Sequence, residues 1–109
     1  MTVSELADAA GYEIISMPRG DDSITGVFTG DLLSHVMGRL TEGAAWVTIM
    51  NNINVLAVAS LTGCSCVIVA DGSELSAEFT TTAMEKEINV LRCAEPAAEA
   101  CIRVGGCLK

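Results

Sequence analysis

The chain has 109 residues, of which 50% are apolar and 18% are charged, and its formal net charge is −8. This length and composition predict a folded protein rather than a disordered one, and we expect residues 1–109 to form a single domain. The excess of Asp and Glu over Lys and Arg argues against binding to nucleic acid or to an anionic membrane surface.

The amino-terminal part of the chain predicts one helix and two strands. Residues 2–10 have the pattern of a short helix that ends at Gly11, and residues 12–15 and 24–28 have the pattern of strands. The segment between these strands contains Pro, Gly and two Asp, so it predicts a loop, and the direction of the first strand stays open. Because the amino terminus is acidic and lacks a basic n-region, it does not resemble a signal peptide, and we expect a cytoplasmic protein.

The next segment predicts a helix and a third strand, over residues 45–50. Asp31 is placed to cap the amino end of this helix, and Gly43 is placed to end it. An apolar stripe at helical spacing is expected to face the core, and it consists of Leu32, Leu33, Val36, Met37 and Leu40.

The segment "NNINVLAVASLTG" (51–63) predicts a polar turn followed by a helix. Asn54 is expected to cap the amino end of this helix, and Gly63 is expected to end it. The helix is apolar nearly all round, which is typical of a buried helix. The continuous apolar run over residues 66–70 predicts a strand that is covered on both faces.

The last part of the chain predicts a weaker helix (76–87), a strand (88–93) and a terminal helix after Pro96 that ends at Gly105-Gly106. From the second strand onward, strands and helices therefore alternate four times. This alternation predicts the α/β class, with three layers (α/β/α) and a mostly parallel sheet of four to five strands.

Polar side chains follow several predicted strands, at the sheet edge where ligands bind in parallel α/β folds. The candidate binding residues are Thr29, Asn51, Asn52 and Asp71, and the segment 93–95 falls at the same edge. Amide side chains donate and accept hydrogen bonds, and the N–H groups of the following helix point into the same space. Two alternatives stay open: Asn51 and Asn52 only satisfy a tight turn, and Asp31 either caps its helix or faces a sugar hydroxyl.

No residue pattern in the sequence identifies a reaction. The chain lacks a glycine-rich phosphate loop and a GxSxG motif, and its single histidine, His35, is expected on the solvated side of a helix. We therefore expect a protein that is not an enzyme, has no catalytic residues and needs no cofactor.

The five cysteines are interpreted as buried or incidental thiols, because their number is odd and no CxxC pair occurs. We accordingly expect neither a disulfide framework nor a metal site. A thiol-based redox or metal module of Cys64, Cys66 and Cys93 is the alternative. Since Cys64 precedes a strand and Cys93 ends one, a parallel sheet would place them at opposite edges, which disfavours this module.

The run "GVFTGDLLSHVMGRLTEGAAWVTIMNNINVLAVASLTGCSCVIVADG" (26–72) resembles the DRTGG-domain family, which is similar to the amino-terminal domain of HPr kinase/phosphorylase. Its most specific parts are "GDLLSHVMG" and "NNINVLAVAS", and the similarity continues more loosely through the last strand. The Asp-Arg-Thr-Gly-Gly signature of the family falls around residues 51–55, where this chain has Asn-Asn-Ile-Asn-Val. This departure argues against a phosphate-rich ligand at that corner.

The resemblance implies a small three-layer α/β domain without catalysis, since the phosphate loop of the kinase relatives belongs to a separate domain. We expect a regulatory or ligand-sensing domain that acts through a small molecule or a protein partner of unknown identity. The alternative is a homo-oligomeric scaffold or assembly subunit, for which the resemblance implies an association with redox or iron–sulfur proteins. In either case we expect a homodimer.

Overall fold

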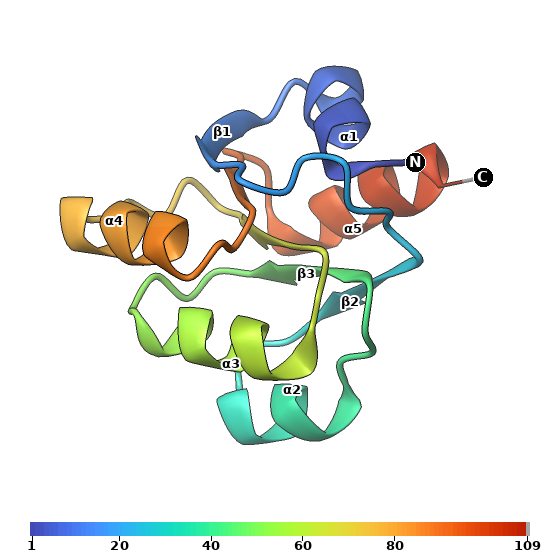
Figure 1. Ribbon diagram of the computed structural model, residues 1–109. Coiled ribbons are helices and arrows are strands. Elements are labelled where there is room, and N and C mark those ends of the chain that lie inside the picture. The colour runs from blue at the N-terminus through green and yellow to red at the C-terminus, as the bar shows by residue number, and fades with distance from the viewer. Residues whose placement is uncertain (109) are drawn as a thin grey trace.

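The computed structural model describes residues 1–108, which form one sheet with helices around it (Figure 1). The strands are β1 (Glu13–Ser16), β2 (Gly26–Thr29), β3 (Ala44–Thr48), β4 (Cys66–Val69) and β5 (Val90–Arg92). The helices are α1 (Val3–Ala10), α2 (Leu33–Arg39), α3 (Asn54–Thr62), α4 (Ala77–Glu85) and α5 (Ala97–Cys107). The strand order is β1-β5-β4-β3-β2, with β1 antiparallel to β5 and every other pair parallel. The predicted α/β class with a mostly parallel sheet is confirmed.

Helices cover both faces of the sheet, which confirms the three predicted layers (Figure 1). Helices α1 and α5 pack on one face, against side chains such as Val47 and Ile68. Helices α2, α3 and α4 pack on the other face, against side chains such as Trp46 and Val67. Strand β4 is buried along its whole length, as its apolar run predicted. Within residues 1–108, no helix has both the length and the apolar character needed to cross a membrane.

The ends of α1 and of α3 follow local sequence signals. The Thr2 hydroxyl accepts a hydrogen bond from the Glu5 amide (3.1 Å), and the Glu5 carboxylate accepts one from the Thr2 amide (2.8 Å). This capping box satisfies two helix-end N–H groups at once. Gly11 and Gly63 follow the two helices in the left-handed conformation, with φ of 69° and 72°, which glycine adopts without strain.

Two predicted amino-terminal caps are wrong. The Asp31 carboxylate does not cap α2, because it accepts hydrogen bonds from the Thr48 hydroxyl (2.7 Å) and the Ile49 amide (3.0 Å) instead. Asn54 does not cap α3, because it is the first residue of that helix, and its amide donates to Oδ1 of Asn52 (3.0 Å). In the first case a neighbouring strand end supplies the partners of the carboxylate, and in the second the helix begins one residue after Ile53, which makes no side-chain cap.

Two predicted helix ends are also wrong. Helix α2 ends at Arg39, before Gly43, which lies in the following turn with φ of 83° and donates its amide to the Gly63 carbonyl (2.9 Å). Helix α5 does not stop at Gly105-Gly106 but continues to Cys107. The buried face of α5 packs on the sheet and offsets the poor helix propensity of the two glycines.

Two helices bury less of their surface than their patterns predicted. In the apolar stripe of α2, Leu32 and Met37 are exposed, whereas Val36 and Leu40 are buried. In α3 only one face is buried, and Leu61 on the other face is exposed. Both helices lie on the outside of the sheet, so each needs only one apolar face (Figure 1).

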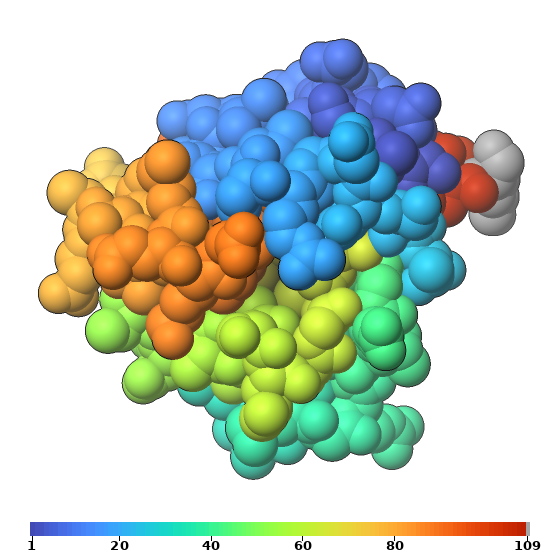
Figure 2. All heavy atoms as spheres, in the orientation of Figure 1, coloured from blue at the N-terminus to red at the C-terminus, as the bar shows by residue number. Residues whose placement is uncertain are grey.

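The connection from β1 to β2 crosses the whole sheet, because these consecutive strands lie at its two opposite edges. We call residues 17–25 the crossing segment. It runs past the amino ends of β5, β4 and β3, and Figure 2 shows it as a blue band across this face of the molecule. Hydrogen bonds fix both ends of this segment. Just before it, the Ser16 hydroxyl donates to the Ile88 carbonyl (2.9 Å), and at its end the Thr25 amide donates to the Gly43 carbonyl (2.9 Å).

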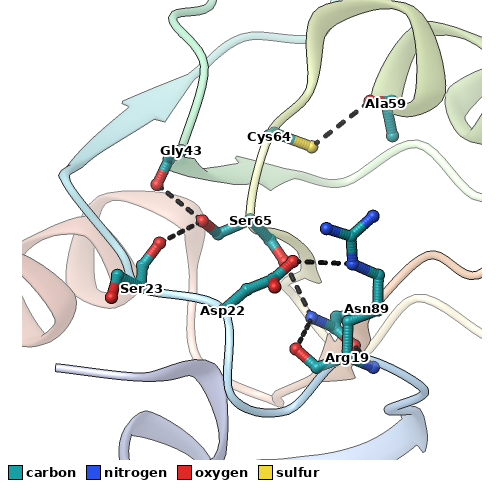
Figure 3. A network of polar contacts seen from close by, with 8 residues as sticks. All are labelled: Arg19, Asp22, Ser23, Gly43, Ala59, Cys64, Ser65 and Asn89. Atoms are coloured by element: carbon teal, nitrogen blue, oxygen red, sulfur yellow. Dashed lines mark hydrogen bonds and ion pairs between the residues drawn. The ribbon is translucent and has the colours of Figure 1, made fainter.

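Asn89 is the buried centre of this attachment and is 2% exposed (Figure 3). Its Oδ1 accepts a hydrogen bond from the Arg19 amide (2.9 Å), and its Nδ2 donates to the carbonyls of Arg19 (2.7 Å) and Ser65 (3.0 Å). The Ser65 hydroxyl in turn contacts the carbonyls of Gly43 (2.8 Å) and Ser23. Two buried side chains therefore satisfy the backbone of three separate segments.

We predict that Asn89→Ala lowers the free energy of unfolding by at least about 2 kcal/mol, because it removes the partners of several buried backbone groups. Urea unfolding followed by circular dichroism measures this loss. Asn51→Ala serves as the control, since that amide is exposed and makes a single hydrogen bond. Its expected loss is below about 1 kcal/mol. Equal losses in the two variants would contradict the role of Asn89.

Candidate functional site

Strands β2 to β5 end at the same edge of the sheet, which we call the carboxyl edge. The loops that follow these strands are joined by hydrogen bonds. Asp31 links the first loop to the second, and the Ser73 hydroxyl of the third loop donates to the Ile49 carbonyl of the second (2.9 Å). The Asp71 amide donates to the Glu95 carbonyl of the fourth loop (2.8 Å). The carboxyl edge is therefore one connected surface made of four loops.

The sequence-predicted residues Thr29 and Asp71 both lie at this edge. The Thr29 hydroxyl donates to the Val47 carbonyl of the neighbouring strand (2.9 Å). Asp71 is exposed and has a left-handed backbone with φ of 62°, a conformation that is uncommon outside glycine.

The predicted Asn51 and Asn52 also have partners within the chain. Asn51 Nδ2 donates to the Glu74 carbonyl (2.9 Å), which ties the loop after β3 to the loop after β4. Asn52 Oδ1 accepts the amide of the residue two positions on, as an Asx turn does. The structure thus places Thr29, Asn51, Asn52 and Asp71 along three neighbouring strand ends, and hydrogen bonds within the protein engage the first three side chains.

A cavity of about 360 Å³ lies at the carboxyl edge, between β5, α1 and α5, and we call it the Tyr12 cavity. It is lined by other residues than the four predicted ones: Ala10, Gly11, Tyr12, Glu13, Arg92, Cys93, Ala94, Glu95 and Arg103. Its volume is that of a site for a small ligand. Two guanidinium groups, two carboxylates and a phenol surround it.

Arg92 is a fixed positive charge in this wall. Its Nε donates to the Ser73 carbonyl (2.7 Å), and its two terminal nitrogens donate to the Gly72 carbonyl (2.9 Å) and to the Glu13 carboxylate (3.0 Å). These contacts join β5 to β1 and to the loop after β4. The guanidinium therefore holds three elements together, and any ligand beside it meets a rigid group.

Glu95 accepts hydrogen bonds from two sides of the cavity. The Arg103 Nε lies 3.1 Å and 3.2 Å from its two oxygens, and the Tyr12 hydroxyl donates to Oε1. The Glu95 side chain is 15% exposed, whereas that of Arg103 is 51% exposed. Glu95 lies in the loop between β5 and α5, Arg103 lies in α5, and Tyr12 lies just before β1. The tertiary fold alone therefore brings these three residues together.

Proton affinities in the cavity follow from these contacts. The Arg103 hydrogen bond, supported by Tyr12, holds the pKa of Glu95 below its ordinary value. Burial and the contact with Glu95 raise the pKa of Tyr12, so its phenol stays protonated and donates. Burial and the nearby Glu95 charge raise the pKa of the Cys93 thiol. A thiol in this state is a weak nucleophile.

Two thiols at the opposite end of the sheet also have raised pKa values. Burial raises the pKa of Cys64 to about 11 and also raises that of Cys66. Cys64 precedes β4 and Cys93 follows the parallel β5, so the two lie at opposite ends of the sheet, as predicted. Among residues 1–108, no three His, Cys, Asp or Glu side chains are grouped as metal ligands.

Sequence reasoning placed Glu95 at the correct edge but missed Tyr12, Arg92 and Arg103. Arg92 carried a signal, since it is a cation at the carboxyl end of an otherwise apolar strand. Tyr12 carried none, because the direction and neighbour of its strand were open. Arg103 lies on an exposed helix face, where a cation is ordinary.

We predict that Glu95 contributes stability at neutral pH that is lost in acid. Because its folded pKa lies below the ordinary value of 4.5, this contribution is complete above that value and disappears as pH falls through the folded pKa. Urea unfolding should therefore show Glu95→Gln less stable than the parent at about pH 7, with a difference that shrinks as the pH falls below 4.5. Glu42→Gln, an exposed change of the same charge, is the control. A difference that persists in acid would contradict this assignment.

No family model and no curated protein matches this chain. Its fold is similar to a crystal structure of the CBS and DRTGG domains of the regulatory region of Clostridium perfringens pyrophosphatase, complexed with the activator diadenosine tetraphosphate. The TM-score is 0.69 at 15% sequence identity, and the match covers 94% of this chain and 46% of that chain. This chain thus spans about half the length of the neighbour. The α/β fold described above is DRTGG-like.

Proposed function

We propose that this chain is a non-catalytic regulatory domain that senses a small molecule at the carboxyl edge of its sheet. The observation that carries the proposal is the DRTGG-like fold, which matches a regulatory region crystallised with its activator over 94% of this chain. Because one fold can host several functions, the site has to supply the rest of the argument.

The Tyr12 cavity supports ligand sensing. It lies at the sheet edge where open α/β folds bind ligands, and its wall combines hydrogen-bond donors with a protected thiol and small side chains. Its loops are connected to the other loops of the carboxyl edge through Asp71 and Arg92. A ligand that moves one loop therefore changes the contacts of the next, which is what a regulatory domain requires.

The same site supports a function without catalysis. The nucleophile candidate Cys93 has a raised pKa, and Tyr12 is held as a proton donor to Glu95. His35 is exposed and stacks on Phe28, with 6.3 Å between the ring centroids. An activated nucleophile needs a base within hydrogen-bonding reach, and these groups do not provide that arrangement.

Two positions along the carboxyl edge compete for the ligand. The sequence favours the corner of Thr29, Asn51, Asn52 and Asp71, where a ligand has to replace hydrogen bonds that the side chains already make. The side chains of the Tyr12 cavity are hydrogen-bonded as well, but they border about 360 Å³ of open volume, and we place the ligand there. The similarity to the amino-terminal domain of HPr kinase/phosphorylase, the homodimer and the cytoplasmic location stay predictions, and light scattering tests the homodimer.

We predict that the purified protein binds at least one small molecule from a panel of nucleotides, sugar phosphates, amino acids and unphosphorylated nucleosides. Diadenosine tetraphosphate belongs in this panel because the structural neighbour was crystallised with it. Native mass spectrometry after anaerobic purification detects a ligand that the protein carries, and a rise in melting temperature detects one that is added. No carried ligand and no response to the whole panel would contradict the proposal.

We predict that Asn51→Ala and Asn52→Ala leave the affinity for such a ligand within about threefold of the parent, a change of less than about 1 kcal/mol. The reason is that both amides act within the turn rather than toward the Tyr12 cavity. Isothermal titration calorimetry measures the affinity. A loss of binding in either variant would move the site to the asparagine corner and leave the sensing function intact.

A further inference from the structure

Two of the chain's few cationic side chains face one cavity. The protein has six Lys and Arg against fourteen Asp and Glu, and Arg92 and Arg103 both line the Tyr12 cavity. Glu13 and Glu95 pair with these two guanidinium groups, so an external anion binds here by competing with a carboxylate of the protein.

The two guanidinium groups differ in how they are held. Arg92 donates to two backbone carbonyls as well as to Glu13, so its position depends on the fold. Arg103 is half exposed, and the contact that orients its Nε is the one with Glu95. An incoming anion therefore gains access to Arg103 by replacing a single carboxylate.

The Tyr12 hydroxyl and the Arg103 guanidinium converge on the Glu95 carboxylate. Two donors from different elements thus surround one anionic group that the protein itself supplies. The raised pKa of Tyr12 keeps the phenol protonated, so both groups remain donors at neutral pH. The same pair of donors suits an oxyanion of an external ligand.

The charge of the ligand determines which oxyanion can replace the Glu95 carboxylate on Tyr12 and Arg103. Glu95 is tethered beside its donors, and a free carboxylate with the same charge has no advantage over it. A phosphate monoester carries a charge of about −1.5 to −2 and three acceptor oxygens, so it binds a guanidinium and a phenol more strongly. The cavity of about 360 Å³ also leaves room for an organic part, beside which Glu13 is placed to accept hydroxyl hydrogens.

We propose that the Tyr12 cavity binds a small hydroxylated phosphate ester, whose phosphate replaces the Glu95 carboxylate on Tyr12 and Arg103. This inference rests on the proposed sensing function and gives its ligand class. Glu95 acts as an internal competitor in the empty site. Its displacement acts on the loop whose backbone carbonyl binds the Asp71 amide, which links the cavity to the rest of the carboxyl edge.

The test is isothermal titration calorimetry of the full chain with ribose 5-phosphate and with adenosine monophosphate. Ribose, adenosine and inorganic phosphate are titrated in parallel, to separate the contributions of the phosphate and of the organic part. We expect a phosphate ester to bind at least about tenfold more tightly than its unphosphorylated counterpart and than inorganic phosphate, a difference of about 1.4 kcal/mol or more.

Substitutions of the donors Tyr12 and Arg103 and of the acceptor Glu95 are expected to change the affinity in opposite directions. Arg103→Gln should weaken binding of the phosphate ester by at least about tenfold, and Tyr12→Phe should weaken it by about threefold or more. Glu95→Gln should strengthen it by about threefold or more, because the competing charge is gone while the amide remains similar in shape. A merely structural role of Glu95 would have the opposite sign. Arg39→Gln and Glu42→Gln are the controls, since each makes the same charge change at an exposed position away from the cavity.

Four results overturn the inference. Weaker or unchanged binding in Glu95→Gln, with the variant folded by circular dichroism, shows that Glu95 does not compete with the ligand. Unchanged binding in Arg103→Gln places the phosphate elsewhere, and the sensing function then stands with a different site. Binding of an unphosphorylated panel compound alone rejects the phosphate ester and likewise leaves the sensing function standing. If no compound of the panel binds, both the phosphate-ester site and the sensing function are rejected.

Discussion

The hydrogen bonds between the Asn89 side chain and the backbone of Arg19 attach the crossing segment, which connects the two edge strands, to the amino end of β5. Consecutive strands normally lie close together, yet β1 and β2 lie at opposite edges. Backbone hydrogen bonds join the crossing segment to residues 1–4, as in the bridge between Thr2 and Ser23, and side chains satisfy further backbone groups of the segment. Asn89 and Ser65 provide those groups at the amino ends of β5 and β4 (Figure 3).

The position of β1 has a direct effect on the candidate site. Because β1 runs antiparallel to β5, its first residue Glu13 lies opposite Arg92, at the carboxyl edge. Tyr12, just before the strand, is thereby placed against Glu95. The amino ends of the parallel strands thus carry the structural attachment and the carboxyl ends carry the polar cavity. The topology therefore places the crossing segment and the candidate site at opposite edges of the sheet.

Local patterns predicted what depends on neighbours in sequence. The alternation of strands and helices, the buried β4 and the glycines at the ends of α1 and α3 all followed from periodicity and backbone conformation. Several of the errors arose where the partner lies far away in the sequence. Asp31 caps no helix because Thr48 offers a hydroxyl across a strand pair, and Tyr12 meets Glu95 across 83 positions. Such contacts are chosen by the tertiary fold, and local sequence carries no record of them.

The pairing of β1 with β5 also has a consequence for how the chain folds. Glu13 and Arg92 are 79 positions apart, so the first strand finds its partner only after nearly the whole chain is available. The parallel block from β2 to β5 is built from successive neighbours and can assemble before this closure. Because so long a loop has to close before β1 pairs with β5, we expect this pairing to form more slowly than the pairing of the successive parallel strands.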